Sequence, residues 1–110
     1  FKDKIVVIKC WFIRCQACVA EMPEFNELID QYKNDRSIVF LSLASDSSES
    51  LQRFLLKREF KYPVVSVSNE YFSDSLNINS FPTHFIIGKG KILKVVNSAK
   101  ELKSALHYLK

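Results

Sequence analysis

The sequence predicts an α/β fold, in which helices cover a mixed central sheet that ends in a β-hairpin followed by a C-terminal helix. Two apolar runs rich in β-branched residues, 5–12 and 37–44, alternate with segments of helical periodicity. Strands that alternate with helices pair in parallel through right-handed crossovers. Inside 81–96, two more apolar runs flank a glycine-containing turn, which is typical of an antiparallel hairpin. A capping box, Ser98 with Glu101, and the apolar stripe after it predict the terminal helix.

The first predicted strand and helix occupy residues 5–33. Residues 5–12 are apolar apart from Lys9, as expected of a strand that is covered on both faces. Period-two alternation puts Lys9 and Trp11 on one face of this strand and Cys10 on the other. In 15–33 the apolar residues recur at spacings of three and four, which predicts a helix that Pro23 should kink.

The middle of the chain continues the alternation. The second strand, 37–44, leads into the segment SDSSES, whose capping residues should open a helix near Ser48. Helical spacing continues to Phe60, and the pair 62–63, Tyr-Pro, should end that helix. Residues 68–78 are irregular, and we expect one short helix in them.

Composition and length limit the classes of protein to consider. Residues 1–110 fit one domain with one core, because 47% of them are hydrophobic and no linker or repeat interrupts them. The chain begins with Phe1 and not Met, so a signal, an anchor or a further domain ahead of it would not be visible. The net charge of +4 comes from scattered lysines without a nucleic-acid motif, and the apolar runs are too short to cross a bilayer. We expect a monomer without a nucleic-acid partner.

Cys15 and Cys18 fall where the first strand ends and the next helix begins. At that place free amide groups and the helix dipole favour negative charge, so a thiol becomes a thiolate more easily. The spacing of three puts Cys18 one turn deeper, yet close enough to Cys15 for a disulfide. Cys15 is therefore the expected attacking thiol and Cys18 the expected resolving thiol.

The cysteine pair also fits uses other than disulfide exchange. Half of a zinc site has the same spacing, but a structural zinc takes about four ligands, and only Cys10, His84 and His107 remain as candidates. We therefore expect no metal site, and Cys10 should be a buried, inert thiol. A soft metal such as Cu(I), held by Cys15, Cys18 and His84 in a chaperone role, stays open as an alternative. So does a redox-silent module used for protein contacts.

Two separated motifs resemble one known family. The segment IVVIKCWFIRCQACVAEMPEF resembles the VVLVNFWATWCxPCxxEMP segment of thioredoxin-like thiol-disulfide oxidoreductases, in particular of the TlpA/ResA-like branch found outside the bacterial cytoplasm. The later segment FPTHFIIGKGKI is similar to that family's xPTTFLIDxxGxI. Together with the order of strands and helices, the resemblance covers essentially the whole chain, and it implies a thioredoxin-like, three-layer α/β/α fold.

The first motif implies catalytic roles. Cys15 corresponds to the family's nucleophile and Cys18 to its resolving thiol. Glu21, three residues after Cys18, matches the glutamate that this branch associates with proton transfer to and from the thiols. Trp11 matches the tryptophan beside the redox pair, although a simple core aromatic would fit the same position.

The second motif implies a substrate-binding surface. Pro82 matches the cis-proline that faces the cysteines, and the backbone of Phe81 would pair with a bound peptide. With Trp11, these residues are the expected substrate contacts. A proline at the start of a hairpin strand is otherwise an ordinary edge residue.

Two cations depart from the family pattern. Arg14 stands where most relatives carry a second tryptophan, and we expect it to favour the thiolate of Cys15 or to attract acidic substrates. Lys9 stands where relatives carry an aspartate or an asparagine. Because a buried ammonium is costly unless it is paired, we expect an ion pair between Lys9 and Glu21 that lowers the pKa of Glu21. The alternative is that Lys9 extends past the sheet edge into solvent.

The expected function follows from the resemblance. It implies an enzyme that reduces disulfides in proteins, is recharged by a membrane or soluble thiol donor, and needs no cofactor. The implied location is extracytoplasmic, in the periplasm or anchored facing it, with a cytoplasmic location left open and cytochrome c maturation as one candidate pathway. A peroxidase needs the motif P-x-x-x-T/S-x-x-C. Because Ile8 and Phe12 occupy its first two defined positions, peroxiredoxin activity is not expected.

Overall fold

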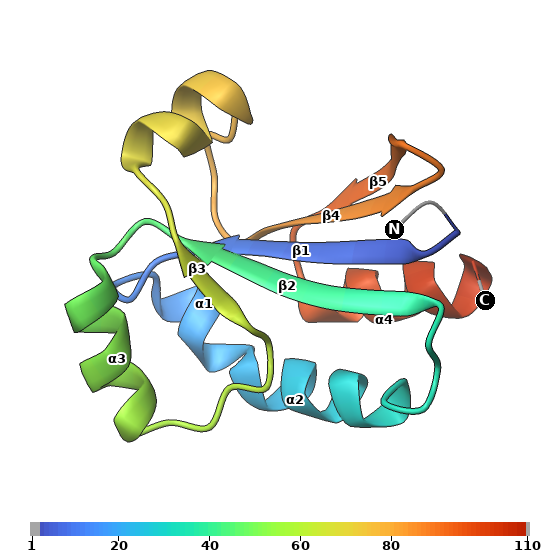
Figure 1. The fold of residues 1–110 in the computed structure, drawn as a ribbon, viewed down its shortest axis with the longest axis horizontal. Coiled ribbons are helices and arrows are strands. Elements are labelled where there is room, and N and C mark those ends of the chain that lie inside the picture. The colour runs from blue at the N-terminus through green and yellow to red at the C-terminus, as the bar shows by residue number, and fades with distance from the viewer. Residues whose placement is uncertain (1–2, 110) are drawn as a thin grey trace.

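The computed structural model describes residues 3–109. At its centre is a sheet of five strands in the order β3-β2-β1-β4-β5 (Figure 1). The strands are β1 (Ile5–Trp11), β2 (Ile38–Ala44), β3 (Val64–Ser66), β4 (Thr83–Gly88) and β5 (Lys91–Val96). β1, β2 and β3 are mutually parallel, whereas β4 runs antiparallel to both β1 and β5. The predicted mixed sheet with a terminal hairpin is confirmed.

The helices are divided unequally between the two faces of the sheet. Four of them, α1–α4, lie on one side, and the short helix η1 lies over the other (Figure 1). The helices are α1 (Gln16–Ala20), α2 (Met22–Gln31), α3 (Ser48–Leu56), η1 (Tyr71–Ser75) and α4 (Ala99–Leu109). The expected three-layer order is present with a thin third layer, and α4 is the predicted C-terminal helix.

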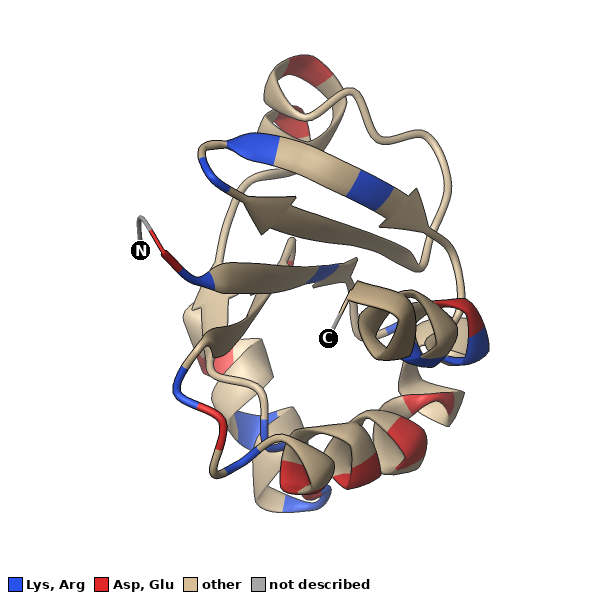
Figure 2. Ribbon diagram, turned by 90° about the vertical axis from the view of Figure 1, so that its right-hand side faces the viewer, with Lys and Arg blue, Asp and Glu red and all other residues tan. Residues whose placement is uncertain are grey.

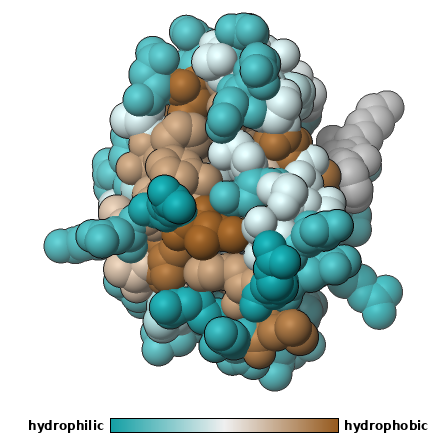
Figure 3. Space-filling view, turned by 90° about the vertical axis from the view of Figure 1, so that its left-hand side faces the viewer, coloured by the Kyte–Doolittle hydropathy of each residue, from teal (hydrophilic) through white to brown (hydrophobic). Residues whose placement is uncertain are grey.

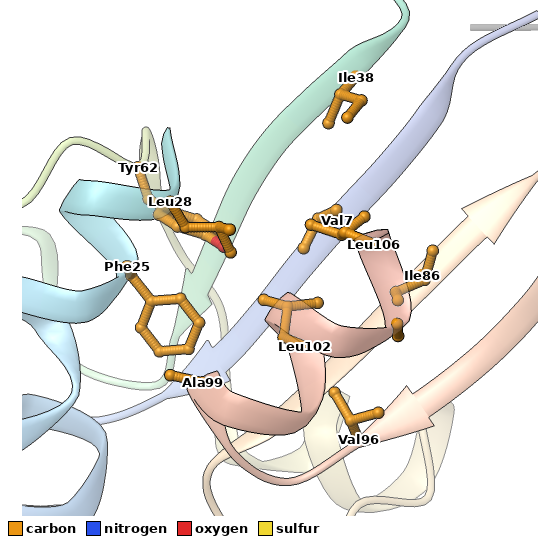
Figure 4. Packing of buried hydrophobic residues seen from close by; sticks show 11 residues of the cluster. Val7, Phe25, Leu28, Ile38, Tyr62, Ile86, Val96, Ala99, Leu102 and Leu106 are labelled. Atoms are coloured by element: carbon orange, nitrogen blue, oxygen red, sulfur yellow. The ribbon is translucent and has the colours of Figure 1, made fainter. Parts of the chain in front are cut away.

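The main core lies between the sheet and the pair α2 and α4. Figure 4 shows Val7 of β1 and Ile86 of β4 close to Leu102 of α4, with Phe25 of α2 on the opposite side of the same cluster. All four side chains are fully buried. Burying a side chain of this kind contributes about 1.5–3 kcal/mol. This packing fixes α2 and α4 against the strand that carries Lys9.

The helix predicted for 15–33 is divided at Glu21, two residues before the Pro23 that was expected to kink it, and it ends at Gln31. Glu21 separates its two parts: its N–H donates to the carbonyl of Ala17, and its own carbonyl accepts from the N–H of Phe25. Pro23 lies in the first turn of α2, where no N–H group is needed. Glu21 therefore lies at the junction of α1 and α2, where its carboxylate reaches the N–H of Ala99.

One helix is shorter than predicted and one strand was missed. Ser47 caps α3 by accepting a hydrogen bond from the N–H of Ser50 at 3.2 Å, and α3 ends at Leu56, short of the predicted Phe60. The unpredicted strand is β3, which pairs only with the last residues of β2. A strand of three residues at the sheet edge is too short to show a period in the sequence.

The hairpin turn and the last helix form as predicted. Lys89 and Gly90, between β4 and β5, have φ angles of 54° and 76°. Positive φ at both central residues defines a type I′ turn, which suits the twist of two antiparallel strands. The hydroxyl of Ser98 accepts from the N–H of Glu101 at 3.1 Å, and the carboxylate of Glu101 accepts from the N–H of Asn97 at 3.3 Å.

Two elements carry charges of one sign. Figure 2 shows acidic residues along α2 and lysines on the β4–β5 hairpin. At the left edge in Figure 1, the carboxyl ends of the three parallel strands meet the N-termini of α1 and α3. This edge carries the cysteine pair. Among residues 3–109, none of the helices combines the length and apolarity that a membrane span requires.

Candidate active site

Cys15 and Cys18 form a disulfide at the start of α1, with their Cα atoms 5.2 Å apart. Cys15 is the N-cap of α1, and its Sγ accepts a hydrogen bond from the N–H of Cys18 at 3.2 Å. Cys15 keeps 9% of its surface exposed, whereas Cys18 is fully buried. The predicted difference in access is confirmed, because only Cys15 can be reached from solvent.

The loop that delivers Cys15 is held by Asp46. The Oδ2 atom of Asp46 accepts a hydrogen bond from the N–H of Ile13 at 2.8 Å, and the N–H of Cys15 donates to the carbonyl of Phe12 at 3.1 Å. Sequence reasoning missed this role, since Asp46 was read only as one of several capping residues before α3. Its position two residues after the end of β2, a strand whose last residue pairs with the end of β1, was the available signal.

The peptide bond between Phe81 and Pro82 is cis, as the resemblance implied. The pairing of Cys10 with Thr83 places Pro82 one residue further on, level with Trp11 at the end of β1. The ring of Phe81 packs edge-on against that of Phe12, with centroids 5.2 Å apart. The loop before Cys15 and the cis-proline segment therefore form one surface.

Trp11 supports the cysteines from below and does not present a surface to solvent. It is fully buried in one apolar cluster with Cys15 and Cys18. Its ring packs against Phe54 at 5.8 Å and Phe60 at 5.6 Å between centroids. The expectation that Trp11 contacts substrate is corrected to a packing role, because a fully buried ring offers a substrate no contact.

Lys9 is buried under the disulfide. Its side chain is 0% exposed, which rules out the alternative that it extends into solvent. The ammonium Nζ donates to the carbonyl oxygen of Cys18 at 3.1 Å and lies 4.0 Å from the centre of the Phe25 ring. Burial lowers the pKa of Lys9 to about 8, against an opposing effect of the negative charge of Glu21.

The expected ion pair between Lys9 and Glu21 is wrong. Within residues 3–109 the structure contains one ion pair, between Lys61 and Asp30. The carboxylate of Glu21 instead accepts a hydrogen bond from the N–H of Ala99, at the start of α4. Glu21 and Lys9 interact only through their charges, at a greater separation.

The expected direction of the Glu21 pKa is wrong for the same reason. Loss of solvation raises the pKa of this half-buried carboxyl group, and this effect exceeds the lowering by the Ala99 hydrogen bond and by the charge of Lys9. The negative charges of Glu24 and Glu101 raise it further. Glu21 is thus a better proton acceptor than the sequence suggested.

A buried histidine lies beside Lys9. His84 of β4 pairs with Lys9 of β1, is fully buried, and packs at a tilt against Phe25 with ring centroids 4.7 Å apart. Burial and the charge of Lys9 lower the pKa of His84 to about 3, so the imidazole is neutral. The structure does not join His84 to Cys15 and Cys18 as the Cu(I) alternative requires. Within residues 3–109 no three His, Cys, Asp or Glu side chains gather around a common point.

Arg14 and Cys10 differ in exposure. Arg14 is exposed directly before Cys15, where a substrate would approach. Cys10 is a free, fully buried thiol in the cluster that packs under η1. The expected burial is confirmed, and burial raises the pKa of Cys10 to about 12.

Comparisons with known proteins agree with this geometry. The model of the AhpC/TSA family matches residues 1–96. The thiol-disulfide oxidoreductase ResA of Oceanobacillus iheyensis is 29% identical over 98% of this chain and 57% of its own length, so the chain spans little more than half of that relative. StoA from Bacillus subtilis has a TM-score of 0.79 and 21% identity over 94% of this chain and 83% of its own.

A third similar protein is an exposed lipoprotein thioredoxin from Streptococcus pneumoniae. Its structure has a TM-score of 0.81 and 22% identity over 98% of this chain and 87% of its own. At such identities the solved structures establish the fold, which is thioredoxin-like. The match to the family model covers most of the sequence, including the cysteine pair and the cis-proline. The chain therefore belongs to the AhpC/TSA family and has a thioredoxin-like fold.

Proposed function

We propose that this chain is a thiol-disulfide oxidoreductase that exchanges its Cys15–Cys18 pair with protein substrates. The observation that carries the proposal is the disulfide at the start of α1, with one sulfur accessible and the other buried. A ResA relative named as a thiol-disulfide oxidoreductase supports it. The missing peroxidase motif directs the proposal away from peroxide reduction, although the family name covers peroxidases.

The proposed reaction moves two electrons. The Cys15 thiolate attacks one sulfur of a substrate disulfide, and the other substrate sulfur leaves as a thiolate. Cys18 then loses its proton and attacks Sγ of Cys15, which releases the second substrate sulfur. The substrate ends as a dithiol and the enzyme as the disulfide seen in the structure. A thiol donor reverses these steps at Cys15 and restores the reduced enzyme.

Neighbouring residues have proposed roles in these steps. Glu21 accepts the proton that Cys18 loses, and its raised pKa and its position at the α1–α2 junction support this role. Phe81 and Pro82 bind the substrate backbone beside Cys15, as the packing of Phe81 against Phe12 supports. Lys9 and Arg14 modulate the thiols. Lys9 acts from below through the carbonyl of Cys18, and Arg14 acts from the solvent side.

We further propose a setting for the reaction. The chain acts as a monomeric reductant outside the cytoplasm and receives electrons from a membrane or soluble thiol donor, with cytochrome c maturation as one candidate pathway. The likeness to an exposed lipoprotein thioredoxin supports the location.

Trapping the mixed disulfide tests the reaction. Reduced Cys18→Ser protein, mixed with a disulfide-containing protein, should accumulate a covalent adduct at Cys15 that mass spectrometry detects and dithiothreitol removes. Cys15→Ser should form none, and Cys10→Ser should turn over like the wild type. Full turnover by Cys15→Ser would overturn the role proposed for the Cys15–Cys18 pair. A wild type that exchanges with no disulfide would overturn the proposal and favour the redox-silent module.

A further inference from the structure

A groove of about 720 Å³ opens next to the cysteines. Its walls come from the loop before Cys15, the start of α3, and the segment from η1 to the cis-proline. Figure 3 shows this face of the molecule, where apolar side chains gather between protruding polar ones. The apolar lining consists mainly of Phe12, Ile13, Phe54, Phe72, Ile78 and Phe81. Because Phe12 and Phe81 also flank the redox pair, whatever fills the groove lies beside Cys15.

The groove carries two guanidinium groups without a partner of opposite charge. Arg14 lines it from the loop before Cys15 and Arg53 from α3, and both are exposed. Neither forms an ion pair with the residues between positions 3 and 109. Of the described residues that line the groove, Asp46 alone is acidic, and one oxygen of its carboxylate already binds the N–H of Ile13. The lining therefore keeps an excess positive charge.

Polar groups at the rim suit an extended chain. Ser45, Ser50, Asn69 and Ser73 line the groove beside the aromatic rings, and their hydroxyl and amide groups can hydrogen-bond to a peptide backbone. An apolar floor with a few polar groups that fix orientation is the usual form of a site that binds a side chain. The guanidinium fork of arginine matches a carboxylate in two parallel hydrogen bonds.

We infer that this groove selects substrate segments that carry an acidic residue close to the reactive cysteine and an aromatic or large apolar residue near it. The apolar side chain occupies the aromatic floor, and the carboxylate binds Arg14, with Arg53 adding to the attraction. This inference rests on the proposed function, since the groove is useful for selection only if a substrate disulfide reaches Cys15. Charge complementarity identifies the partner, because a basic segment would place like charges together at the groove.

Matched peptides test the selection. Four disulfide-linked fluorescent peptides are compared. Three have one sequence with a phenylalanine near the cysteine and differ only in carrying Glu, Gln or Lys beside the cysteine. The fourth is the Glu peptide with Ser in place of the phenylalanine. The rate constant for reduction by the reduced wild type should follow Glu over Gln over Lys, with about three- to tenfold between the extremes at low salt. Added salt should shrink this ratio, and the Ser peptide should react more slowly than its parent.

Variants show where the selection arises. Arg14→Gln and Arg53→Gln should each reduce the Glu-to-Lys ratio, and the double variant should bring it close to one. Lys103→Gln on α4 loses the same charge away from the groove and serves as the matched control. Using the ratio removes any effect of Arg14 on the reactivity of Cys15 itself, since that effect is common to all the peptides.

The outcomes separate the two proposals. Equal rates for the Glu and Lys peptides, or a ratio that falls as much in Lys103→Gln as in Arg53→Gln, would overturn the inference while leaving disulfide exchange intact. A reduced wild type that reacts with none of the four peptides, nor with a small neutral disulfide, would overturn the proposed function instead.

Discussion

The ammonium of Lys9 donates a hydrogen bond to the carbonyl oxygen of Cys18 at 3.1 Å, from a position with no exposure to solvent. This contact ties a buried positive charge to the resolving cysteine of the redox pair. The charge is partly compensated by the ring of Phe25, 4.0 Å away, and by the more distant carboxylate of Glu21. A cation held there interacts differently with a neutral disulfide and with a thiolate.

Replacing Lys9 should therefore make the protein a stronger reductant. The ammonium stabilises a thiolate more than a disulfide, so Lys9→Met removes a stabilisation that only the reduced form enjoys. We expect the reduction potential to fall by about 10–30 mV, where about 30 mV corresponds to about 1.4 kcal/mol. Equilibration with glutathione buffers at neutral pH measures this change. Lys103→Met on the exposed surface of α4 should leave the potential unchanged, and a Lys9→Met potential equal to that of the wild type would contradict the electrostatic role.

The buried lysine should also make stability depend on alkaline pH. Its folded pKa is about 8 against an ordinary value of 10.5, so between these values the unfolded chain binds more protons than the folded one. Stability therefore rises with pH in that window, by about 1.4 kcal/mol per unit for a single group. Urea unfolding of the oxidised protein at pH 8 and 9 measures it.

The comparison must isolate Lys9 from other groups. Cys10 and Tyr62 have raised pKa values and act in the opposite direction at high pH. They remain in Lys9→Met, so the difference between wild type and variant reports on Lys9. We expect the wild type to gain on the order of 1 kcal/mol relative to Lys9→Met from pH 8 to 9. A difference that stays constant or moves the other way would show that Lys9 titrates normally.

Sequence reasoning succeeded where a local period or a motif decides the outcome. Alternation along β1 placed Lys9 and Trp11 on one face and Cys10 on the other, because a strand has a fixed period of two. The family resemblance predicted the cis peptide bond before Pro82, which composition and periodicity do not indicate.

The same reasoning failed where side chains meet across the fold. Alternation indicates the face on which Lys9 lies, but not which acceptor its long side chain reaches. The partner of Glu21 is the N–H of Ala99, 78 positions away, and that contact exists because α1 breaks at Glu21 and α4 begins beside it. Asp46 was missed for a similar reason, since Ser47 is the residue that caps α3 and leaves Asp46 available to Ile13.

Neutralising Glu21 should slow the transfer of electrons to the substrate. In Glu21→Gln the amide oxygen still accepts from the N–H of Ala99, so the fold is kept, but the side chain no longer accepts a proton. We expect the rate of disulfide reduction at pH 7 to fall on the order of 100-fold, the usual size of a lost proton transfer. The pH profile should also lose one inflection above pH 4.5, because the pKa of Glu21 is raised. Stopped-flow fluorescence across pH measures both.

Glu24→Gln is the matched control for Glu21. Glu24 is exposed in the first turn of α2. Its replacement by Gln removes a nearby charge of the same sign and leaves the α1–α2 junction at Glu21 unchanged. It should change the rate at pH 7 less than about threefold. If the two variants slow the reaction equally, or if Glu21→Gln keeps the wild-type profile, Glu21 does not carry the proton.

Removing the Asp46 carboxylate should loosen the loop that presents Cys15. Asp46→Ala leaves the N–H of Ile13 without its acceptor at 2.8 Å, and losing such a charge-assisted bond costs about 1.5–3 kcal/mol. Asp46→Asn keeps an oxygen acceptor and should lose less than half of that. Amide hydrogen exchange at Ile13 and Cys15 should accelerate in Asp46→Ala, while exchange in β4 stays slow.

The residues that lose protection from hydrogen exchange distinguish a local effect from general destabilisation. Because Asp46 holds the segment between β1 and α1, disulfide exchange should slow for every substrate, including a small neutral disulfide. Ser66→Ala removes the hydroxyl that donates to the carbonyl of Asp46 and tests whether the backbone support of the same residue matters. Unchanged exchange at Ile13 in Asp46→Ala would mean that the loop is fixed by the packing of Phe12 on Phe81 alone.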